Sequence, residues 1–257
     1  VNSLSISDLT GIEDFTALTD LNCSNNIITS LDVSQYTALT LLYCNFNQLT
    51  TLDVSNNTAL TQLNSGDNQL TTFDISNNTA LTYLWCYGNQ LTTLDVSQHI
   101  ALTELWCQNN QLANLNVNNN TALMQFNCES NQLTNLDVSQ NTALTVLHSG
   151  NNQIATLDVS QNTALIQFGC QNNQLTTLDV SNNISLTDFQ CALNSLINLD
   201  VRNGNNTNFT NFASGQNPNL FCIDVDDALW STANWTNIDP WASFSLNCAT
   251  AFGCTDS

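Results

Sequence analysis

The sequence predicts a β-rich solenoid of about ten rungs, with two parallel sheets and little helix. A phrase of the form Leu-Asp-Val-Ser returns every 21 residues, and between its copies runs a second phrase, Leu-x-x-Leu-x-Cys-x-x-Asn. Neither phrase has the 3.6-residue spacing of an amphipathic helix. A fixed period of this length is typical of a solenoid, in which each repeat packs only on its neighbours. The first phrase begins at Leu31, Leu52, Phe73, Leu94, Leu115, Leu136, Leu157, Leu178 and Leu199.

Each repeat is expected to contain two short strands joined by turns. Leu102, Leu105 and Cys107 should face inward while Glu104 and Trp106 face outward, because side chains alternate along a strand. The Leu-Asp-Val-Ser phrase is the second strand. An Asn closes the turn after the first strand, and its buried amide should bond turn backbone in its own rung and in the next. These residues are Asn26, Asn47, Asn68, Asn89, Asn110, Asn131, Asn152, Asn173, Asn194 and Asn217.

One slot of the repeat holds seven of the ten cysteines, and Ser65 and Ser149 take it in two other repeats. A slot that accepts either residue type is a small buried position. It also lacks the paired Cys-x-x-Cys spacing of zinc sites, so we expect packed thiols rather than metal ligands. The seven cysteines are Cys23, Cys44, Cys86, Cys107, Cys128, Cys170 and Cys191.

The chain is expected to divide into a cap, an array and a second cap. Residues 1–17 are an irregular first repeat and form the N-terminal cap. The array covers residues 18–225, and residues 226–257 hold the C-terminal cap and the start of a linker. Terminal repeats of a solenoid are atypical because they must shield the core from water.

The C-terminal cap contains three tryptophans, Trp230, Trp235 and Trp241. We expect them to cover the last rung, and a ligand site is the alternative interpretation. Either Asp226 or Asp227 is placed to cap a helical turn there. Cys222 and Cys248 are expected to form a disulfide that staples this cap, which would imply an oxidising compartment.

The repeat resembles the leucine-rich repeat, with Leu39, Leu42, Cys44, Asn47 and Leu49 in the positions of its motif. The resemblance covers roughly residues 9 to 225, and the 21-residue length is similar to the short bacterial subtype of internalin-like and Bacteroidetes secreted surface proteins. It implies a right-handed superhelix with one parallel sheet on its concave side. It also implies an extracellular or cell-surface location. The last five residues, with Cys254, resemble the start of a linker repeat in which Cys254 has lost its partner.

The charge balance limits the classes of partner. The chain has 257 residues, 21 acidic side chains and a single basic one, Arg202, for a formal net charge of −20. Such a field repels nucleic acid and anionic membranes, and it favours cations or cationic partners. No apolar run approaches the ~20 residues that cross a bilayer, so no membrane insertion is expected.

Outward positions of the first strand vary from repeat to repeat, and several are aromatic in four successive repeats. Contiguous exposed aromatic side chains usually mark a binding surface, whereas inert packing is the alternative. Asp67 flanks the aromatic residues and would suit a basic or hydroxyl-rich ligand. The candidate ligand-binding residues are Tyr43, Phe46, Tyr83, Trp85, Tyr87, Glu104, Trp106, Glu129 and His148.

An aspartate recurs in the second strand of nearly every repeat, broken by Asn116. Stacked carboxylates repel one another at the ~5 Å spacing of strands. Hydrogen bonds to neighbouring hydroxyl and backbone groups, with screening by salt, are the simpler remedy. The alternative is weak Ca²⁺ binding between adjacent carboxylates, such as those of Asp53, Asp74 and Asp95. No cofactor is required by either interpretation. The column is Asp32, Asp53, Asp74, Asp95, Asp137, Asp158, Asp179, Asp200 and Asp224.

The sequence predicts a non-enzymatic, monomeric binding module that recognises a protein or a glycan. It contains no Ser-His-Asp set, no glycine-rich phosphate loop and no metal signature. Two rival functions stay open, a carbohydrate-directed adhesion module and a structural spacer without a ligand. An enzyme would need a pocket, which a shallow sheet rarely offers.

Overall fold

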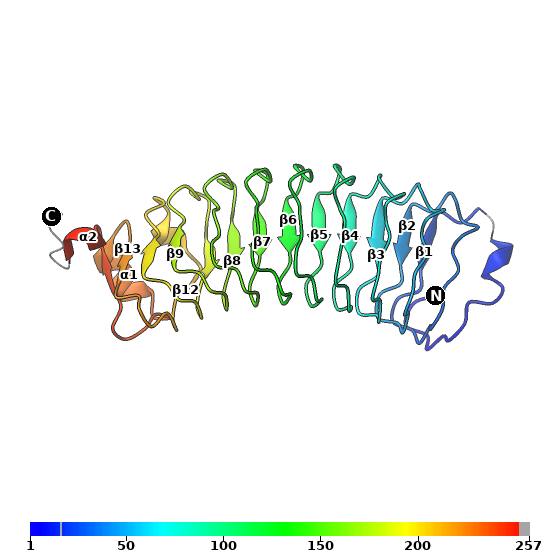
Figure 1. Ribbon diagram of the computed structural model, residues 1–257, viewed down its shortest axis with the longest axis horizontal. Coiled ribbons are helices and arrows are strands. Elements are labelled where there is room, and N and C mark those ends of the chain that lie inside the picture. The colour runs from blue at the N-terminus through cyan, green and yellow to red at the C-terminus, as the bar shows by residue number, and fades with distance from the viewer. Residues whose placement is uncertain (16, 252–257) are drawn as a thin grey trace. The chain divides into compact units, whose positions relative to one another are not determined.

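The computed structural model describes residues 1–15 and 17–251. Contacts divide the chain into two compact units, Val1–Gln132 and Leu133–Ser257. Each unit is a stack of rungs that present three-residue parallel strands along one side (Figure 1). The β-rich solenoid predicted from the repeat is therefore confirmed.

The first unit carries six strands within its described residues, in the order of the sequence. Equivalent residues of successive repeats lie directly opposite one another, as Leu63 does to Leu84. The strands are β1 (Asp20–Asn22), β2 (Leu41–Tyr43), β3 (Gln62–Asn64), β4 (Tyr83–Trp85), β5 (Glu104–Trp106) and β6 (Gln125–Asn127).

Burial alternates along each strand, as the pleat requires. In β4, Leu84 is fully buried between the half-buried Tyr83 and Trp85. Leu and Phe residues at the central strand position therefore stack into the core, while the residues on either side of them stand on the outer face. This outer face of β1–β6 is called the strand face below.

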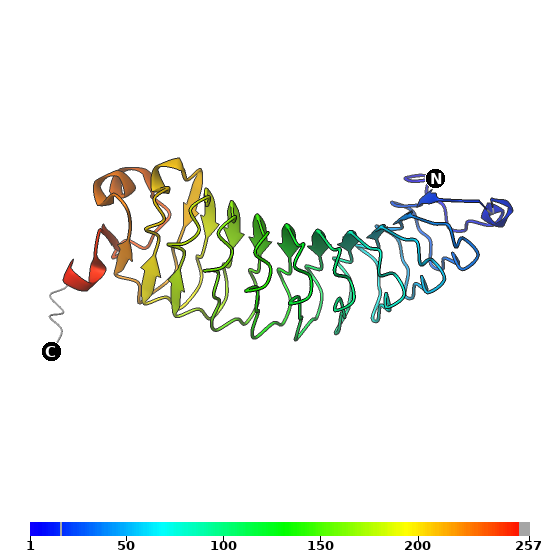
Figure 2. The same cartoon turned by 90° about the horizontal axis from the view of Figure 1, so that it is seen from above.

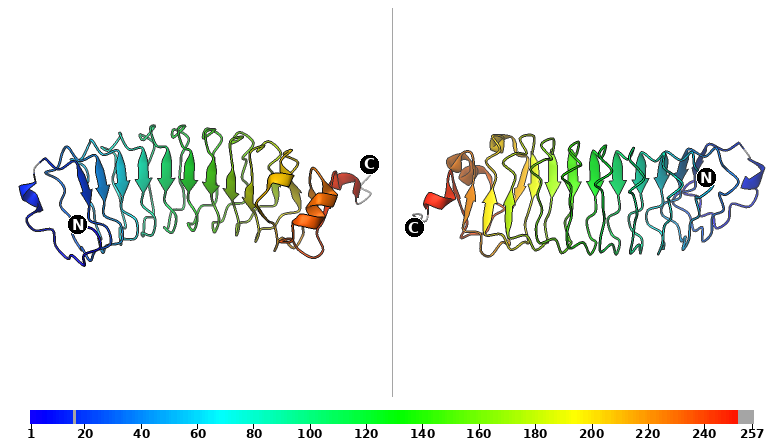
Figure 3. Two further views of the ribbon diagram at one scale, coloured as in Figure 1. Left: turned by 180° about the vertical axis from the view of Figure 1, so that it is seen from behind. Right: turned by 45° about the horizontal axis from the view of Figure 1, so that its top comes forward.

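The second unit has two rows of strands on opposite sides of its rungs (Figures 2 and 3). The first row is β7 (Val146–His148), β8 (Gln167–Gly169), β10 (Asp188–Gln190) and β12 (Asn211–Ala213). The second row is β9 (Thr177–Asp179), β11 (Asn198–Asp200), β13 (Cys222–Asp224) and β14 (Ser243–Ser245). The second parallel sheet predicted from the Leu-Asp-Val-Ser phrase is thus present here.

That second sheet does not extend through the first unit, where the described copies of the phrase form no strand. In the second unit the Val180 N–H donates to the Asp200 carbonyl of the next rung, 2.9 Å away. A side-chain amide joins the rungs in both units: in the second unit the Asn183 amide donates to the carbonyls of Val159 (3.0 Å) and Asn162 (2.9 Å). In the first unit the buried amide of Asn78 donates to the carbonyls of Val54 (3.0 Å) and Asn57 (2.9 Å) in the preceding rung.

The predicted asparagine ladder runs along the turn after the first strand, but it reaches back to the preceding rung rather than to the next one. The Asn89 amide donates to the carbonyls of Cys86 and Tyr87 in its own rung, both at 3.1 Å. It also donates to Ser65 of the preceding rung at 3.1 Å, and its oxygen accepts the Leu70 N–H at 2.9 Å. One buried side chain thus satisfies four backbone groups of two rungs.

The seven cysteines of the repeat are all buried thiols, and Ser65 and Ser149 are equally buried in the same slot. Burial raises the pKa of the Cys86 thiol to about 12. A thiol reacts as its thiolate, so these side chains act as small packing residues.

The N-terminal segment, residues 1–6, is held to the first rung by hydrogen bonds of its backbone. Asn26 bonds it through its oxygen, which accepts the N–H groups of Leu4 and Ile6, and through its amide, which donates to the Val1 carbonyl. A short 3₁₀ helix, η1 (Ile12–Asp14), follows.

The C-terminal cap closes the exposed end of the turn ladder with a carboxylate. In the array, turn N–H groups donate to carbonyls of the next rung, as Leu193 does to Gly215. After β12 the buried Asp239 replaces those carbonyls, because its two oxygens accept the N–H groups of Gln216 (2.9 Å) and Asn217 (2.7 Å). Asp239 therefore ends the ladder without leaving unpaired donors.

The cap also contains α1 (Ala228–Asn234), α2 (Cys248–Ala251) and the 3₁₀ helix η2 (Asn206–Asn208). Asp227 caps α1 by accepting the N–H groups of Leu229 and Trp230. The prediction that three tryptophans cover the last rung is wrong in part. Trp235 is buried, Trp230 is half-buried and Trp241 is 48% exposed, because Trp241 lies in the turn before β14 rather than over the core.

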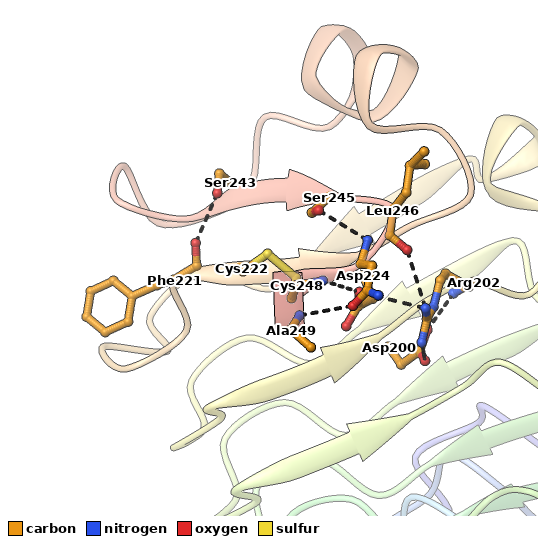
Figure 4. Close-up of a disulfide and its surroundings, with 11 residues drawn as sticks. Asp200, Arg202, Phe221, Cys222, Asp224, Ser243, Ser245, Leu246, Cys248 and Ala249 are labelled. Atoms are coloured by element: carbon orange, nitrogen blue, oxygen red, sulfur yellow. Dashed lines mark hydrogen bonds and ion pairs between the residues drawn. A yellow bond between two sulfur atoms is a disulfide. The ribbon is translucent and has the colours of Figure 1, made fainter. Parts of the chain in front are cut away.

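Cys222 and Cys248 form a disulfide between β13 and α2 (Figure 4). Beside it, Arg202 pairs with Asp200, lies 3.9 Å from the Asp224 carboxylate and donates to the Leu246 carbonyl. The one cationic side chain of the protein thus joins two carboxylates of the aspartate column to the cap. Cys254 lies outside the described residues.

Elsewhere in the aspartate column each carboxylate bonds the backbone two residues ahead. Asp74 accepts the Ser76 N–H at 2.9 Å, and this bond, together with the Ser76 hydroxyl, holds the pKa of Asp74 below its usual range. Asn116 makes the same bond with the Asn118 N–H, also at 2.9 Å. The turn therefore needs an acceptor and not a charge.

Replacing Asn89 by Ala should destabilise the protein strongly, because a buried N–H and several buried carbonyls lose their partner. We expect a loss of at least about 2 kcal/mol in the free energy of unfolding, measured by urea denaturation. Asn77→Ala is the matched control, since the exposed Asn77 donates only to the Ser55 carbonyl. Its effect should stay within about 0.5 kcal/mol, and equal losses in both variants would contradict the role of the ladder.

Asp74→Asn should keep the turn but lose the charge that the Ser76 hydrogen bonds favour. We expect the variant to melt at the same or a slightly lower temperature than the parent at pH 7, and Asp74→Ala to melt lower still. A carboxyl group whose pKa is lower in the folded state stabilises the fold at pH values above its unfolded-state pKa. That stabilisation is lost as the pH falls through the folded-state pKa. The parent should therefore lose more stability in acid than Asp74→Asn. A calcium-dependent rise in the melting temperature of the parent, absent in Asp74→Asn, would instead support the calcium alternative.

Candidate functional site

Four aromatic rings meet on the strand face of the first unit. We call Tyr43, Tyr83, Trp85 and Trp106 the aromatic cluster. Trp85 is its centre, with ring centroids 5.9 Å from Tyr43, 6.0 Å from Tyr83 and 5.6 Å from Trp106. Tilted aromatic contacts at these separations are favourable beyond the area that they bury.

The register of the strands explains how the rings reach one another. Trp85 lies directly opposite Trp106 on β5. Asn64 of β3 lies between Tyr43 and Trp85, and it is short and buried, so these two rings meet across it. The Tyr43 hydroxyl donates to the Gln62 side chain at 2.6 Å, which fixes its ring. All four aromatic side chains of the cluster are half-buried, with their outer parts on the surface.

Tyr87 and Phe46 extend the aromatic surface onto the neighbouring turn, with centroids 6.5 Å apart in an edge-on contact. The Tyr87 ring sits on Gly66, where an added Cβ would lie 2.5 Å from it. Burial, and next the nearby Asp67 carboxylate, raise the pKa of the Tyr87 hydroxyl. Only glycine, which has no Cβ, leaves room for the Tyr87 ring at this position, which we call the Gly66 seat.

Phe46 occupies an unfavourable backbone conformation. Its φ is +54°, in the left-handed region that Asn25, Asp67, Gly88 and Asn109 also adopt at the equivalent position. Asn, Asp and Gly tolerate this region, whereas a bulky side chain does so at a cost. Phe46 is also 47% exposed, so burial of its ring does not repay that cost. Leu193 of the second unit, 43% exposed, adopts the same conformation at the equivalent position, so the conformation belongs to the turn of the repeat, and what distinguishes Phe46 is its exposed ring.

Carboxylates flank the rings. Glu104 lies opposite Tyr83 in the strand register, and Asp67 follows Gly66 in the turn. Burial raises the pKa of both carboxyl groups, because each charged form is partly removed from water. The sequence of the first unit holds no Lys or Arg. The aromatic surface is therefore bordered by negative charge.

The other two residues predicted for this site lie apart from the ring contacts. Glu129 is half-buried in the turn after β6, where its N–H donates to the Asn127 side chain. His148 lies on β7 in the second unit, opposite Gly169 of β8. The structure therefore brings together six aromatic residues and two carboxylates of the first unit, and it places His148 in the other unit.

The calcium alternative finds no assembled site among the described residues. No group of three or more His, Cys, Asp or Glu side chains that could hold a metal ion occurs there. Asp53 and Asp95 each accept the N–H of their own Ser, as Asp74 does. Within residues 1–15 and 17–251, no helix is long and apolar enough to cross a membrane.

Sequence reasoning missed Gly66 and Asn64, the residues that let the rings approach. A signal for Gly66 was present. The position after the Cys slot holds Asn45, Gly66, Tyr87 and Gln108 in successive repeats, so the glycine falls one rung before the tyrosine. Comparing neighbouring repeats at one position would have paired the two residues.

Comparisons with known proteins give matches among solved structures only. No protein-family model and no curated protein matches the sequence. The functional domain of InlJ from Listeria monocytogenes, described as including a cysteine ladder, is 35% identical with a TM-score of 0.70. The match covers 94% of this chain and 60% of that domain, so the chain spans less than two thirds of its length.

Two more distant structures share the fold. A leucine-rich-repeat protein of Leptospira interrogans is 23% identical, with a TM-score of 0.69, over 91% of this chain and 74% of that one. The Arabidopsis receptor kinase HAESA, solved with a peptide hormone and a co-receptor, is 22% identical, with a TM-score of 0.67, over 82% of this chain and 39% of that one.

Replacing Gly66 by Ala should push the Tyr87 ring off its seat. Because the clash involves the far end of the ring, we expect the free energy of unfolding to change by no more than about 1 kcal/mol. The pKa of Tyr87 should fall towards the ordinary value of about 10, since the hydroxyl becomes more exposed. Ultraviolet titration of the variant, with Tyr87→Phe to identify the signal, measures this. An unchanged titration would mean that Gly66 does not position the ring.

Proposed function

Because this chain has the leucine-rich-repeat fold, we propose that it is a protein-binding module whose ligand docks on the aromatic cluster of the first unit. The fold provides a rigid ladder, and the variable outward side chains provide the recognition. One of the similar structures, HAESA, was solved with a bound peptide hormone, which supports the use of this fold for recognition.

The observation that carries the proposal is that six aromatic side chains of one unit, five half-buried and Phe46 exposed, present part of their surface to solvent. Aromatic residues are enriched among the side chains that dominate binding energy, and contiguous apolar patches on a soluble surface usually serve recognition. The Tyr43 hydrogen bond and the Gly66 seat hold two of the rings in place. Fixed rings lose little conformational entropy when a ligand binds.

The flanking charges indicate the chemistry of the partner. Glu104 and Asp67 border the rings, and the whole chain carries a formal net charge of −20. A partner that presents Lys or Arg beside apolar side chains would gain from the carboxylates and from cation–π contact with Trp85 or Trp106. A glycan could stack on the same rings, so a carbohydrate-directed adhesion module is the second candidate, and a spacer without a ligand is the third.

The proposed setting is extracellular or at a cell surface. The disulfide between Cys222 and Cys248 supports an oxidising compartment. We further propose that the module acts as a monomer, without catalysis and without a required cofactor.

The double replacement of Trp85 and Trp106 by Ala should abolish binding while the fold persists. The two rings lie outside the core, so we expect only a small change in melting temperature and a large loss of affinity. We expect at least a hundredfold weaker binding, since two central aromatic anchors each contribute about 2 kcal/mol or more. Purified surface proteins and a glycan array, probed in parallel with the parent and the variant, identify the class of partner.

Ile100→Ala is the matched control, because Ile100 is an exposed apolar residue of the same unit, 66% exposed and outside the cluster. It should bind as the parent does. Binding to glycans alone would favour the adhesion module. Equal binding by parent and double variant would refute the role of the aromatic cluster, and the absence of any partner for the parent would favour the spacer.

A further inference from the structure

A second aromatic site lies in the C-terminal cap, within the second unit. A groove of about 320 Å³ runs between the residues after η2, the start of β12 and helix α1. Helix α1 contacts η2 and β14, so that it stands beside the last rung (Figure 3). We call this hollow the cap groove.

Aromatic rings form one side of the cap groove. Trp235 is buried and stacks on Phe212, with centroids 4.1 Å apart, so it covers the last rung. Phe209 lies 5.2 Å from Trp235, and Trp230 meets Trp235 edge-on at 5.9 Å. Phe209 and Trp230 are only half-buried. Trp235 therefore covers the last rung, together with Phe244 at 5.6 Å, and the rings of Phe209 and Trp230 are left with accessible surface.

Neutral polar groups form the other side. The buried indole N–H of Trp235, which lines the groove, has no hydrogen-bond partner in the described part of the chain, and the side chain of Asn237 is exposed. Asn234 uses its amide nitrogen on the Trp230 carbonyl, and Asn211 uses its own on Asp188, so both retain a carbonyl oxygen. The cap groove thus offers donors and acceptors that the fold does not use.

The cap groove contains no charged side chain, although the protein has 21 acidic residues. An ionic ligand would gain nothing from direct pairing there. The volume is at the lower end of the roughly 300–1,000 Å³ of small-molecule sites. The ligand should therefore be small, neutral and rich in hydroxyl groups, with an apolar face that can lie on a ring.

We propose that the cap groove binds a neutral pyranose sugar, as one unit of a glycan. The C–H face of the sugar stacks on Trp230 or Phe209, and its hydroxyl groups bond the amides of Asn234 and Asn237. Aromatic rings supply apolar contact at little entropic cost, and amides both donate to and accept from hydroxyl groups. This site is separate in sequence and in chemistry from the acidic aromatic cluster of the first unit.

A proline-rich peptide is the other ligand that aromatic grooves accept. Such a peptide needs an extended track of rings. The cap groove is bounded by a seven-residue helix and a three-residue strand, which suits one or two sugar rings better than an extended peptide.

The test uses the full chain carrying Trp85→Ala and Trp106→Ala, so that the first unit cannot contribute. Saturation-transfer NMR and calorimetry measure binding of neutral oligosaccharides built from glucose, mannose, galactose or N-acetylglucosamine, with a proline-rich peptide alongside. We expect at least one of these sugars to bind. Trp230→Ala should weaken that binding about tenfold or more, the equivalent of about 1.4 kcal/mol.

Leu229→Ala is the matched control, because Leu229 is 87% exposed on the same helix and does not line the cap groove. It should bind sugar as the parent does. Asn237→Ala is the second test variant, since it removes an exposed amide of the cap groove but keeps the backbone carbonyl that accepts the Ser214 N–H. It should also weaken binding with an unchanged melting temperature.

Three results would overturn the proposal. They are no binding of any neutral sugar at millimolar concentration, sugar binding that Asn237→Ala and Trp230→Ala leave unchanged, and binding of the proline-rich peptide alone. None of these results bears on the aromatic cluster, because the background variant already lacks it.

Discussion

The rest of the structure depends on the buried side-chain amide of the turn asparagine. Each such Asn satisfies backbone groups of its own rung and of the preceding one, as Asn89 does for Cys86 and Ser65. A buried backbone group without a partner costs about as much as a lost hydrogen bond. The ladder therefore holds consecutive repeats at one fixed offset within each unit. Leucine burial supplies the driving force for folding, but leucines alone would tolerate a slip between rungs.

The geometry of the candidate site follows from that fixed offset. Residues 21 positions apart are brought directly opposite one another, so Trp85 and Trp106 meet although neither contributes to the core. The ladder leaves the outward positions free, and small changes there shape the surface. Gly66 makes room for Tyr87, and Asn64 allows Tyr43 to reach Trp85. The candidate site is thus a local variation on a scaffold that does not vary.

Much of the fold could be predicted because each structural position of the repeat recurs every 21 residues and can be compared across the repeats. The strand, the cysteine slot and the turn asparagine are each visible many times in the sequence. The extent of the second sheet was not predictable, since the same phrase forms strands near Val180 but not in its described copies in the first unit, although side-chain amides join the rungs in both units. The separate roles of Trp230, Trp235 and Trp241 were also hidden. They occur once, in a segment with no period to compare.

The carboxylate of Asp239 has a consequence for how such proteins change length. It offers two oxygens where another repeat would offer two main-chain carbonyls, so the stop signal is indifferent to how many repeats come before it. Duplication or deletion of whole repeats upstream leaves that terminus intact. The array can therefore gain or lose whole repeats while the same C-terminal cap is kept. The outward-facing surface of the array can change without a new cap.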